Sequence, residues 1–134
     1  MTAEDHINNI RENYLGSPEK TLNALAGAVD RLLKAFPRRG HFLIEFIQNA
    51  DDARSSKVRI QNDERGILIT NNGNEFNEKD VDAICSVGRP SKKPEEYIGY
   101  LGVGFKSVFL VSDSPSIVSG LYLFTFRACC TTAK

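Results

Sequence analysis

The stretch from residue 41 to residue 54 combines a polar and an apolar stripe at helical spacing, and it constrains the fold more than any other part of the chain. Glu45, Asn49 and Asp52 follow one another at i, i+4 and i+7, which places them on one face of a helix at about 100° per residue. The adjoining stripe is apolar: Phe46, Ile47, Ala50 and Ala53. The pattern predicts a helix that packs one side into a core and lines a polar site with the other.

Apolar periodicity and turn residues predict the elements around this helix. Ser17 and Pro18 are typical of a helix start. Helices are predicted for residues 3–14, 18–36, 41–54, 78–86 and 105–110. Strands are predicted for residues 57–60, 66–70, 116–118 and 121–126, in two hairpins that turn at residues 62–65 and 119–120.

This order of elements predicts the α+β fold class. The helix at 78–86 has Asn77 as its predicted N-cap, and its predicted buried face consists of Val81, Ile84 and Cys85. Helices that outnumber and flank short hairpins favour a two-layer α/β sandwich. Its sheet is expected to be mixed and mostly antiparallel, with the helices gathered on one face.

Composition and charge exclude several classes of protein. A chain of 134 residues with 41% hydrophobic and 25% charged residues is typical of a single globular domain. Its formal net charge of zero gives no electrostatic footprint for nucleic acid or an acidic membrane. The cluster at residues 38–41, Arg-Arg-Gly-His, is interpreted as a solvated corner between helices. Three cysteines without metal-ligand spacing and an N-terminus without an apolar signal segment predict an intracellular protein, cytoplasmic or nuclear.

The last predicted helix is preceded by three glycines: Gly99, Gly102 and Gly104. Glycine lets backbone N–H groups approach a ligand closely, and a helix that begins at Phe105 favours an anion at its N-terminus. A bound phosphate is therefore expected, although a plain connector between helices would use glycine in the same way. Two common phosphate motifs are excluded. In a Walker loop lysine directly follows glycine, but here Phe105 separates Gly104 from Lys106, so Lys106 is expected to point elsewhere. The segment also lacks the buried upstream strand and the third glycine of a dinucleotide fingerprint.

Glu45 and Asn49 offer two kinds of oxygen one helical turn apart. Mg²⁺ takes one or two protein oxygens together with phosphate oxygens and water, so Asn49 is a candidate magnesium ligand. Glu45 is a candidate general base for hydrolysis of a phosphoanhydride. Taken alone, an acid and an amide at these positions are more often solvated helix residues. The catalytic interpretation depends on their register together with the Asn-Asn-Gly strand end and the glycine-rich helix start.

In this order, the three blocks resemble the motifs of the GHKL ATPases, which share the Bergerat nucleotide-binding fold. Residues 45–53 are similar to an acid followed by Asn-Ala-x-Asp-Ala, and residues 99–107 match a Gly-x-x-Gly-x-Gly-Phe block. Residues 70–73, Thr-Asn-Asn-Gly, stand at the place of an Asp-x-Gly strand end. Within the superfamily, the sequences of residues 48–53, 102–109 and 113–120 most resemble the sacsin and NO VEIN type of domain.

The resemblance implies that ATP binds with Mg²⁺ between the helix at 41–54 and the sheet. Asn71 and Gly73 would lie near adenine, Asn49 would hold Mg²⁺, and Glu45 would activate water. Asp52 is counted with the nucleotide-binding residues because it belongs to the first motif. The phosphates would lie under a lid at residues 86–104. The implied phosphate contacts are Lys92, Gly99, Gly102, Val103 and Gly104 in this range and Phe105 directly after it.

Two features depart from the family pattern. Asn71 replaces the adenine-binding aspartate of most relatives, and a neutral amide forms weaker hydrogen bonds than a carboxylate. The sheet is also expected to be truncated at its C-terminal end, because relatives continue through further strands. Residues 1–36 are predicted to be a helical extension, residues 37–126 the nucleotide-binding core, and residues 127–134 an unplaced tail of a single ATP-binding domain.

Three functions follow from this sequence. The leading one is a Mg-dependent ATPase domain, gated by its lid, with a chaperone-like or regulatory role. The second is an ATP-sensing or protein-interaction module that binds ATP without turnover, and the third is an inactive fragment of a larger sacsin-like protein. The expected partners are ATP and protein clients or further domains of a longer protein, with no nucleic acid and no membrane.

Overall fold

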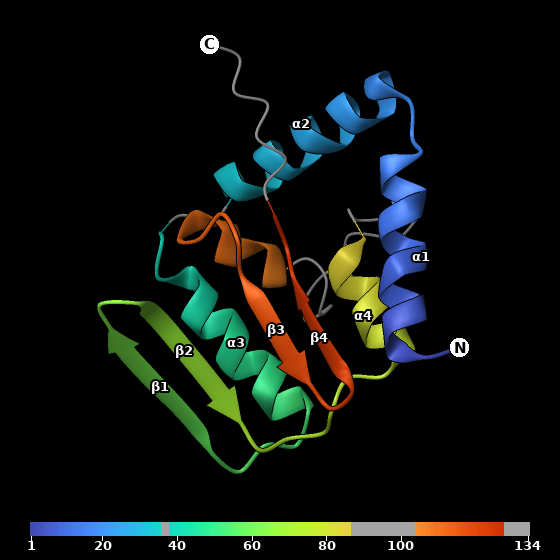
Figure 1. The fold of residues 1–134 in the computed structure, drawn as a ribbon. Helices are drawn as coiled ribbons and strands as arrows, with labels where there is room; N and C mark the ends of the chain where they lie inside the picture. The colour runs from blue at the N-terminus through green and yellow to red at the C-terminus, as the bar shows by residue number, and fades with distance from the viewer. Residues whose placement is uncertain (36–37, 87–103, 128–134) are drawn as a thin grey trace.

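The computed structural model describes residues 1–35, 38–86 and 104–127 and has an α+β fold (Figure 1). Its α-helices are α1 (Ala3–Leu15), α2 (Glu19–Ala35), α3 (His41–Asp52) and α4 (Glu78–Cys85), and a 3₁₀-helix, η2, covers Lys106–Leu110. Its strands are β1 (Val58–Asp63), β2 (Gly66–Asn71), β3 (Ser116–Ser119) and β4 (Tyr122–Thr125). In these ranges no helix is both long and apolar enough to cross a membrane.

The strands of the described residues form two separate antiparallel sheets, each a single hairpin. β1 pairs only with β2, and β3 pairs only with β4. The predicted continuous sheet therefore does not form among these strands, because every pairing is made with the strand next in sequence. The coarser prediction is confirmed: the chain is α+β, with helices beside small antiparallel sheets.

Both hairpin turns differ from their predicted positions. Asp63 pairs with Gly66, so the first turn contains two residues, whereas four were predicted. In the second hairpin Ser119 pairs with Tyr122, so the turn moves one residue onward, and Gly120 adopts a φ of 56° there. Side-chain polarity marked the predicted ends of the strands, but ladder hydrogen bonds use the backbone and continue through polar residues.

Local capping explains where two helices begin. The side chain of Asn77 accepts the N–H groups of Lys79 and Asp80, and Asp80 accepts the Asn77 N–H, which completes a capping box. The predicted N-cap is thereby confirmed. Thr2 and Asp5 form the same arrangement at the start of α1.

The buried apolar side chains come from α3, α4 and β4. Val81 and Ile84 are fully buried, as predicted for this face of α4, and Phe42, Ala50 and Tyr122 join them. The prediction that Ile47 packs into the core was wrong, because its side chain is 51% exposed. At about 100° per residue Ile47 lies about 140° around the helix from Phe42, outside the sector that is covered.

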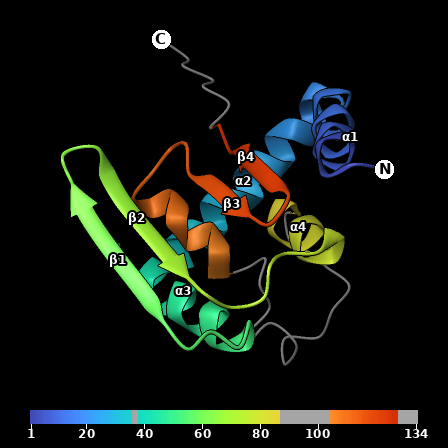
Figure 2. The same cartoon turned by 60° about the horizontal axis from the view of Figure 1, so that its bottom comes forward.

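The elements lie in a consistent order across two views. The β1–β2 hairpin lies on one side of α3, and the β3–β4 hairpin, α4 and α1 lie on the other (Figure 1 and Figure 2). The short helix η2 packs against α2 and α3, while α1 packs against α4 and β4. This places the end of the glycine-rich segment beside the polar face of α3.

Candidate functional site

The carboxylate of Glu45 lies directly against the backbone of Gly104. A Cβ atom built on Gly104 would overlap Oε2 and Cδ of Glu45, so the backbone can come this close only because residue 104 is glycine. Gly104 is buried, and the Glu45 side chain is 20% exposed. The structure therefore brings together two of the predicted site residues, one from α3 and one from the end of the glycine-rich segment.

His41 holds the second oxygen of the same carboxylate. Its Nε2 lies 2.9 Å from Glu45 Oε1, and because a carboxylate only accepts, the imidazole N–H donates. The two residues are spaced i, i+4 on α3, and the His41 side chain is 26% exposed. Sequence reasoning had interpreted His41 as part of a solvated corner. The signal it missed was this i, i+4 spacing to Glu45.

Asn49 and Asp52 occupy the following turns of α3. Asn49 is half-buried and Asp52 is exposed at the last position of the helix. Among the described residues no cluster of three or more His, Cys, Asp or Glu side chains is arranged to hold a metal ion. A magnesium ion at Asn49 would thus need oxygens from another molecule, which is the normal coordination of Mg²⁺ bound to nucleotide phosphates.

The Asn-Asn-Gly strand end lies against the C-terminus of α3. Asn74 N–H donates to Ala53 O at 2.7 Å, and a Cβ on Gly73 would lie 2.7 Å from the same oxygen. Glycine is therefore required where this loop crosses the helix end. Asn71 Oδ1 accepts the N–H of Gly73 at 2.8 Å, so one acceptor position of the predicted adenine contact is already used locally.

The Lys106 side chain reaches α4 and is 4% exposed. Its Nζ donates to the carbonyl of Ile84 in the last turn of α4, a helix that carries no basic residue of its own there. Burial lowers the pKa of Lys106 to about 8, because the surrounding protein disfavours the charged ammonium. Tyr14 from α1 donates to the neighbouring Cys85 carbonyl at 2.9 Å.

The predicted helix after the glycines is a short 3₁₀-helix. Phe105 precedes η2 and packs its ring 5.7 Å from that of Phe126, between centroids. A five-residue helix has a small dipole, so the expected attraction for an anion rests mainly on backbone N–H groups. The other predicted contacts lie outside the described residues: Lys92, Gly99, Gly102 and Val103.

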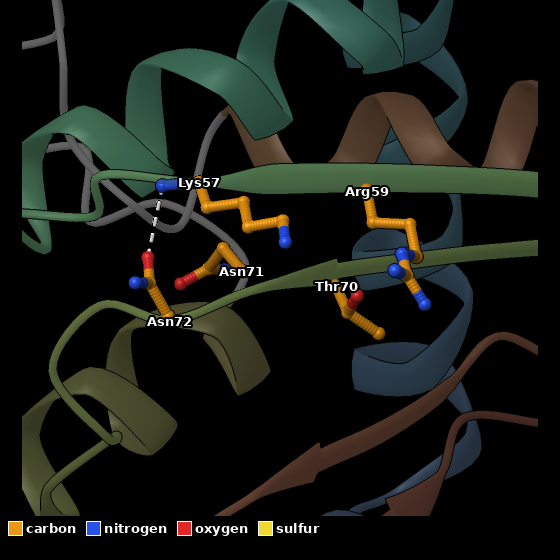
Figure 3. A pocket seen from close by; sticks show the side chains of 5 residues that line it. All are labelled: Lys57, Arg59, Thr70, Asn71 and Asn72. Carbon is orange, nitrogen blue, oxygen red and sulfur yellow. Dashed lines mark hydrogen bonds between the residues drawn. The ribbon is translucent and has the colours of Figure 1, made fainter.

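A second feature lies on the β1–β2 hairpin and was not predicted. A shallow hollow of about 230 Å³ opens there, and we call it the cationic hollow (Figure 3). Its lining residues are Lys57, Arg59, Thr70, Asn71 and Asn72. The signal in the sequence was the alternation of Lys57 and Arg59 with the apolar residues Val58 and Ile60.

Comparison with known proteins gives one family and several relatives. The family described as "Sacsin domain" matches residues 23–132. Protein NO VEIN of Arabidopsis thaliana is 38% identical over 97 residues, covering 68% of this chain, and human sacsin is 30% identical over 135 aligned residues, covering 87%. Chaperone protein HtpG of Borrelia garinii is 30% identical over 109 residues, covering 58% of the chain.

The matched regions are small parts of these relatives. The chain spans 4% of NO VEIN, 3% of sacsin and 18% of HtpG. No solved structure matches the chain significantly.

Proposed function

Because this chain belongs to the sacsin domain family, we propose that it forms the nucleotide-binding part of a GHKL-type ATPase domain that binds and hydrolyses ATP with Mg²⁺. The similarity to a bacterial chaperone supports a chaperone-like or regulatory role. The helix α3, the hairpin β1–β2 and the short helix η2 would then be the parts of a Bergerat fold that surround the nucleotide.

The contact between Glu45 and Gly104 is the observation that carries this proposal. It joins an acid that is suited to proton transfer to the end of a segment whose backbone N–H groups are suited to phosphate. The alternative interpretation of Glu45 is a solvated helix acid. Such a side chain would extend into water and would not lie against a buried glycine. One carboxylate oxygen is instead hydrogen-bonded to His41, and the other lies close to the backbone of Gly104.

The residues present fit a magnesium nucleotide in chemical type. Asn49 would hold the metal, the glycine-rich backbone the phosphates, and Asn71 with Gly73 the adenine. When bound, Mg²⁺ would neutralise charge on the phosphate oxygens. Glu45 would accept a proton from water, and His41 would keep the carboxylate oriented for that transfer.

Substitution of Glu45 in the full chain tests the proposal. Glu45→Gln keeps the shape and removes the base, so ATP binding should persist while phosphate release falls by about 10²–10⁴-fold. The matched control is Glu64→Gln, which removes an exposed carboxylate from the turn of the β1–β2 hairpin. Turnover that is equal in Glu45→Gln and in the unaltered chain would refute the catalytic role.

A second candidate function is nucleotide sensing without turnover. It is favoured by Asn71, whose amide is uncharged and whose oxygen already accepts the Gly73 N–H. The phosphate-release assay separates the two functions when it is combined with the free energy of unfolding of the unaltered chain, measured with and without Mg-ATP. Binding at a hundredfold excess over Kd adds about 2.7 kcal/mol of stability, and that gain without phosphate release would select sensing.

A further inference from the structure

We propose that the cationic hollow on the β1–β2 hairpin binds a phosphate group or a comparable multiply charged oxyanion through Lys57 and Arg59. The hollow lies apart from the Glu45–Gly104 contact, since none of its lining residues lies on α3 or η2, and it shares only Asn71 with the proposed adenine contact. Nothing in the proposed ATPase chemistry uses either of these two cations.

Strand register places the charged side chains on the exposed face of the hairpin. Arg59 pairs with Thr70, and side chains at i and i+2 of a strand share a face, so Lys57, Arg59 and Thr70 lie together. Val58 and Ile69 alternate with them and are half-buried, whereas Lys57, Arg59 and Thr70 are exposed. Figure 3 shows Lys57, Arg59 and Thr70 along the same stretch of the hairpin.

Neither cation has a carboxylate partner among the described residues. The ion pairs found there join His6 to Asp82, Lys34 to Asp30, and His41 to Glu45. The described residues that line the hollow also include no acid. Two positive side chains whose Cα atoms are about 7 Å apart on one strand face repel each other, and an anion between them would relieve that repulsion.

The asparagines fix the backbone around the hollow and leave mainly donors for a ligand. Asn72 Oδ1 accepts the N–H groups of Ser56 at 3.0 Å and of Lys57 at 2.9 Å, the latter drawn in Figure 3. Asn71 Oδ1 accepts the Gly73 N–H. Both amide oxygens are therefore occupied, while the ammonium, guanidinium and hydroxyl groups can donate outward. Such a donor-rich lining selects an oxyanion over a cation or an apolar group.

The size of the hollow limits the ligand to one charged group. Pockets that enclose whole small molecules measure about 300–1,000 Å³, and this hollow of about 230 Å³ is smaller and open to solvent. A whole nucleotide would extend beyond it into solvent. A phosphate, free or carried on a protein side chain, matches both its size and its charge.

Titration with inorganic phosphate tests the proposal on the full chain. Amide resonances of ¹⁵N-labelled protein are followed at an ionic strength of about 0.01 M, where screening is weak, with chloride as the reference anion. Saturable shifts are expected at Arg59, Thr70 and Asn71 with phosphate and not with chloride. The dissociation constant should rise about tenfold in Arg59→Gln, since a charge-assisted hydrogen bond is lost.

Arg65→Gln is the matched control, because it removes the same charge from the turn of the same hairpin. Its dissociation constant should stay within about twofold of that of the unaltered chain. Equal weakening by both variants would overturn the proposal, because it would show a general effect of net charge. Shifts confined to Gly104 would overturn it as well, by assigning phosphate to the glycine-rich segment.

A second arm identifies the source of the anion. A phosphoserine peptide and its unphosphorylated form replace the inorganic ion in the same titration. Tighter binding of the phosphopeptide than of free phosphate, lost in Arg59→Gln, would assign the site to a phosphorylated protein segment. Equal affinity would assign it to the free anion. Saturable binding of neither probe at Arg59 and Thr70 would refute the site.

Discussion

Glu45 has two neighbours that limit the movement of its carboxylate. His41 donates to one oxygen from the preceding turn of α3, and the backbone of Gly104 lies against the other. A general base works best when its geometry is set before the substrate arrives, because misplacement by about 1 Å can cost about 10²-fold in rate. The pair of contacts on Glu45 is suited to that requirement.

The contact with Gly104 makes a specific prediction for stability. In Gly104→Ala the new methyl group overlaps the Glu45 carboxylate, so the free energy of unfolding should fall by about 1–3 kcal/mol. In a Glu45→Ala background the overlapping atoms are absent, and the same substitution should be close to neutral. Urea unfolding of the four proteins measures this coupling. Equal costs in both backgrounds would contradict the contact.

At the scale of elements, α4 ends on contacts from two distant parts of the chain. Lys106 from η2 donates to Ile84 O and Tyr14 from α1 donates to Cys85 O, so the last carbonyl groups of α4 have partners. These contacts fasten η2, and with it the end of the glycine-rich segment, to α4. The proposed site therefore depends on how η2 and α1 pack against the end of α4.

Burial of Lys106 predicts a stability that depends on pH. Its pKa is lowered from 10.5 to about 8, so between these values the unfolded chain binds more protons and stability rises with pH, by at most about 1.4 kcal/mol per pH unit. Burial also raises the pKa of the Cys85 thiol to about 11, so above pH 9 that group acts in the opposite direction. The effect of Lys106 is therefore clearest between about pH 8 and pH 9.

Urea unfolding of the unaltered chain and of Lys106→Met at about pH 8 and pH 9 measures this effect. The unaltered chain should gain about 1 kcal/mol relative to Lys106→Met over this interval. Lys79→Met, which removes an exposed lysine from α4, should show no such relative change. A constant difference between the unaltered chain and Lys106→Met would contradict the inferred burial of a charged amine.

At the scale of the whole molecule, α1 is joined to the rest of the chain by a buried histidine. His6 Nε2 lies 2.8 Å from Asp82 on α4, and His6 Nδ1 lies 3.0 Å from the hydroxyl of Tyr122 on β4. Because the family match begins at residue 23, α1 lies outside it. The contacts nevertheless make α1 part of the same packed unit as the core.

Substitution of His6 tests how firmly α1 is attached. His6→Phe fills the space but leaves the Tyr122 hydroxyl without its partner, so the free energy of unfolding should fall by about 1–3 kcal/mol. Asn8→Ala, at an exposed position of the same helix, should change it by less than about 0.5 kcal/mol. Thermal or urea unfolding provides the measurement. A loss that is equally small in both variants would show that α1 is not held by this histidine.

Several features of the fold and site could be predicted because they are encoded locally. The capping box at Asn77 involves only neighbouring residues, and the buried face of α4, with Val81 and Ile84, follows from helical periodicity. The polar face with Glu45 and Asn49 lies on a helix that begins where it was predicted. The hairpins were also found, although their turns were displaced because strand pairing does not depend on side-chain polarity.

The helices, the hairpins and the register of the candidate site residues could thus be inferred from local patterns, since each depends on spacing within a few turns or one tight loop. Packing between distant segments places Glu45 against Gly104, joins Lys106 to the end of α4, and joins α1 to β4 through His6. The two hairpins also stay separate sheets. These outcomes depend on which distant surfaces pack together and exclude water. The hydrophobic periodicity of a single segment does not predict which other segment it packs against.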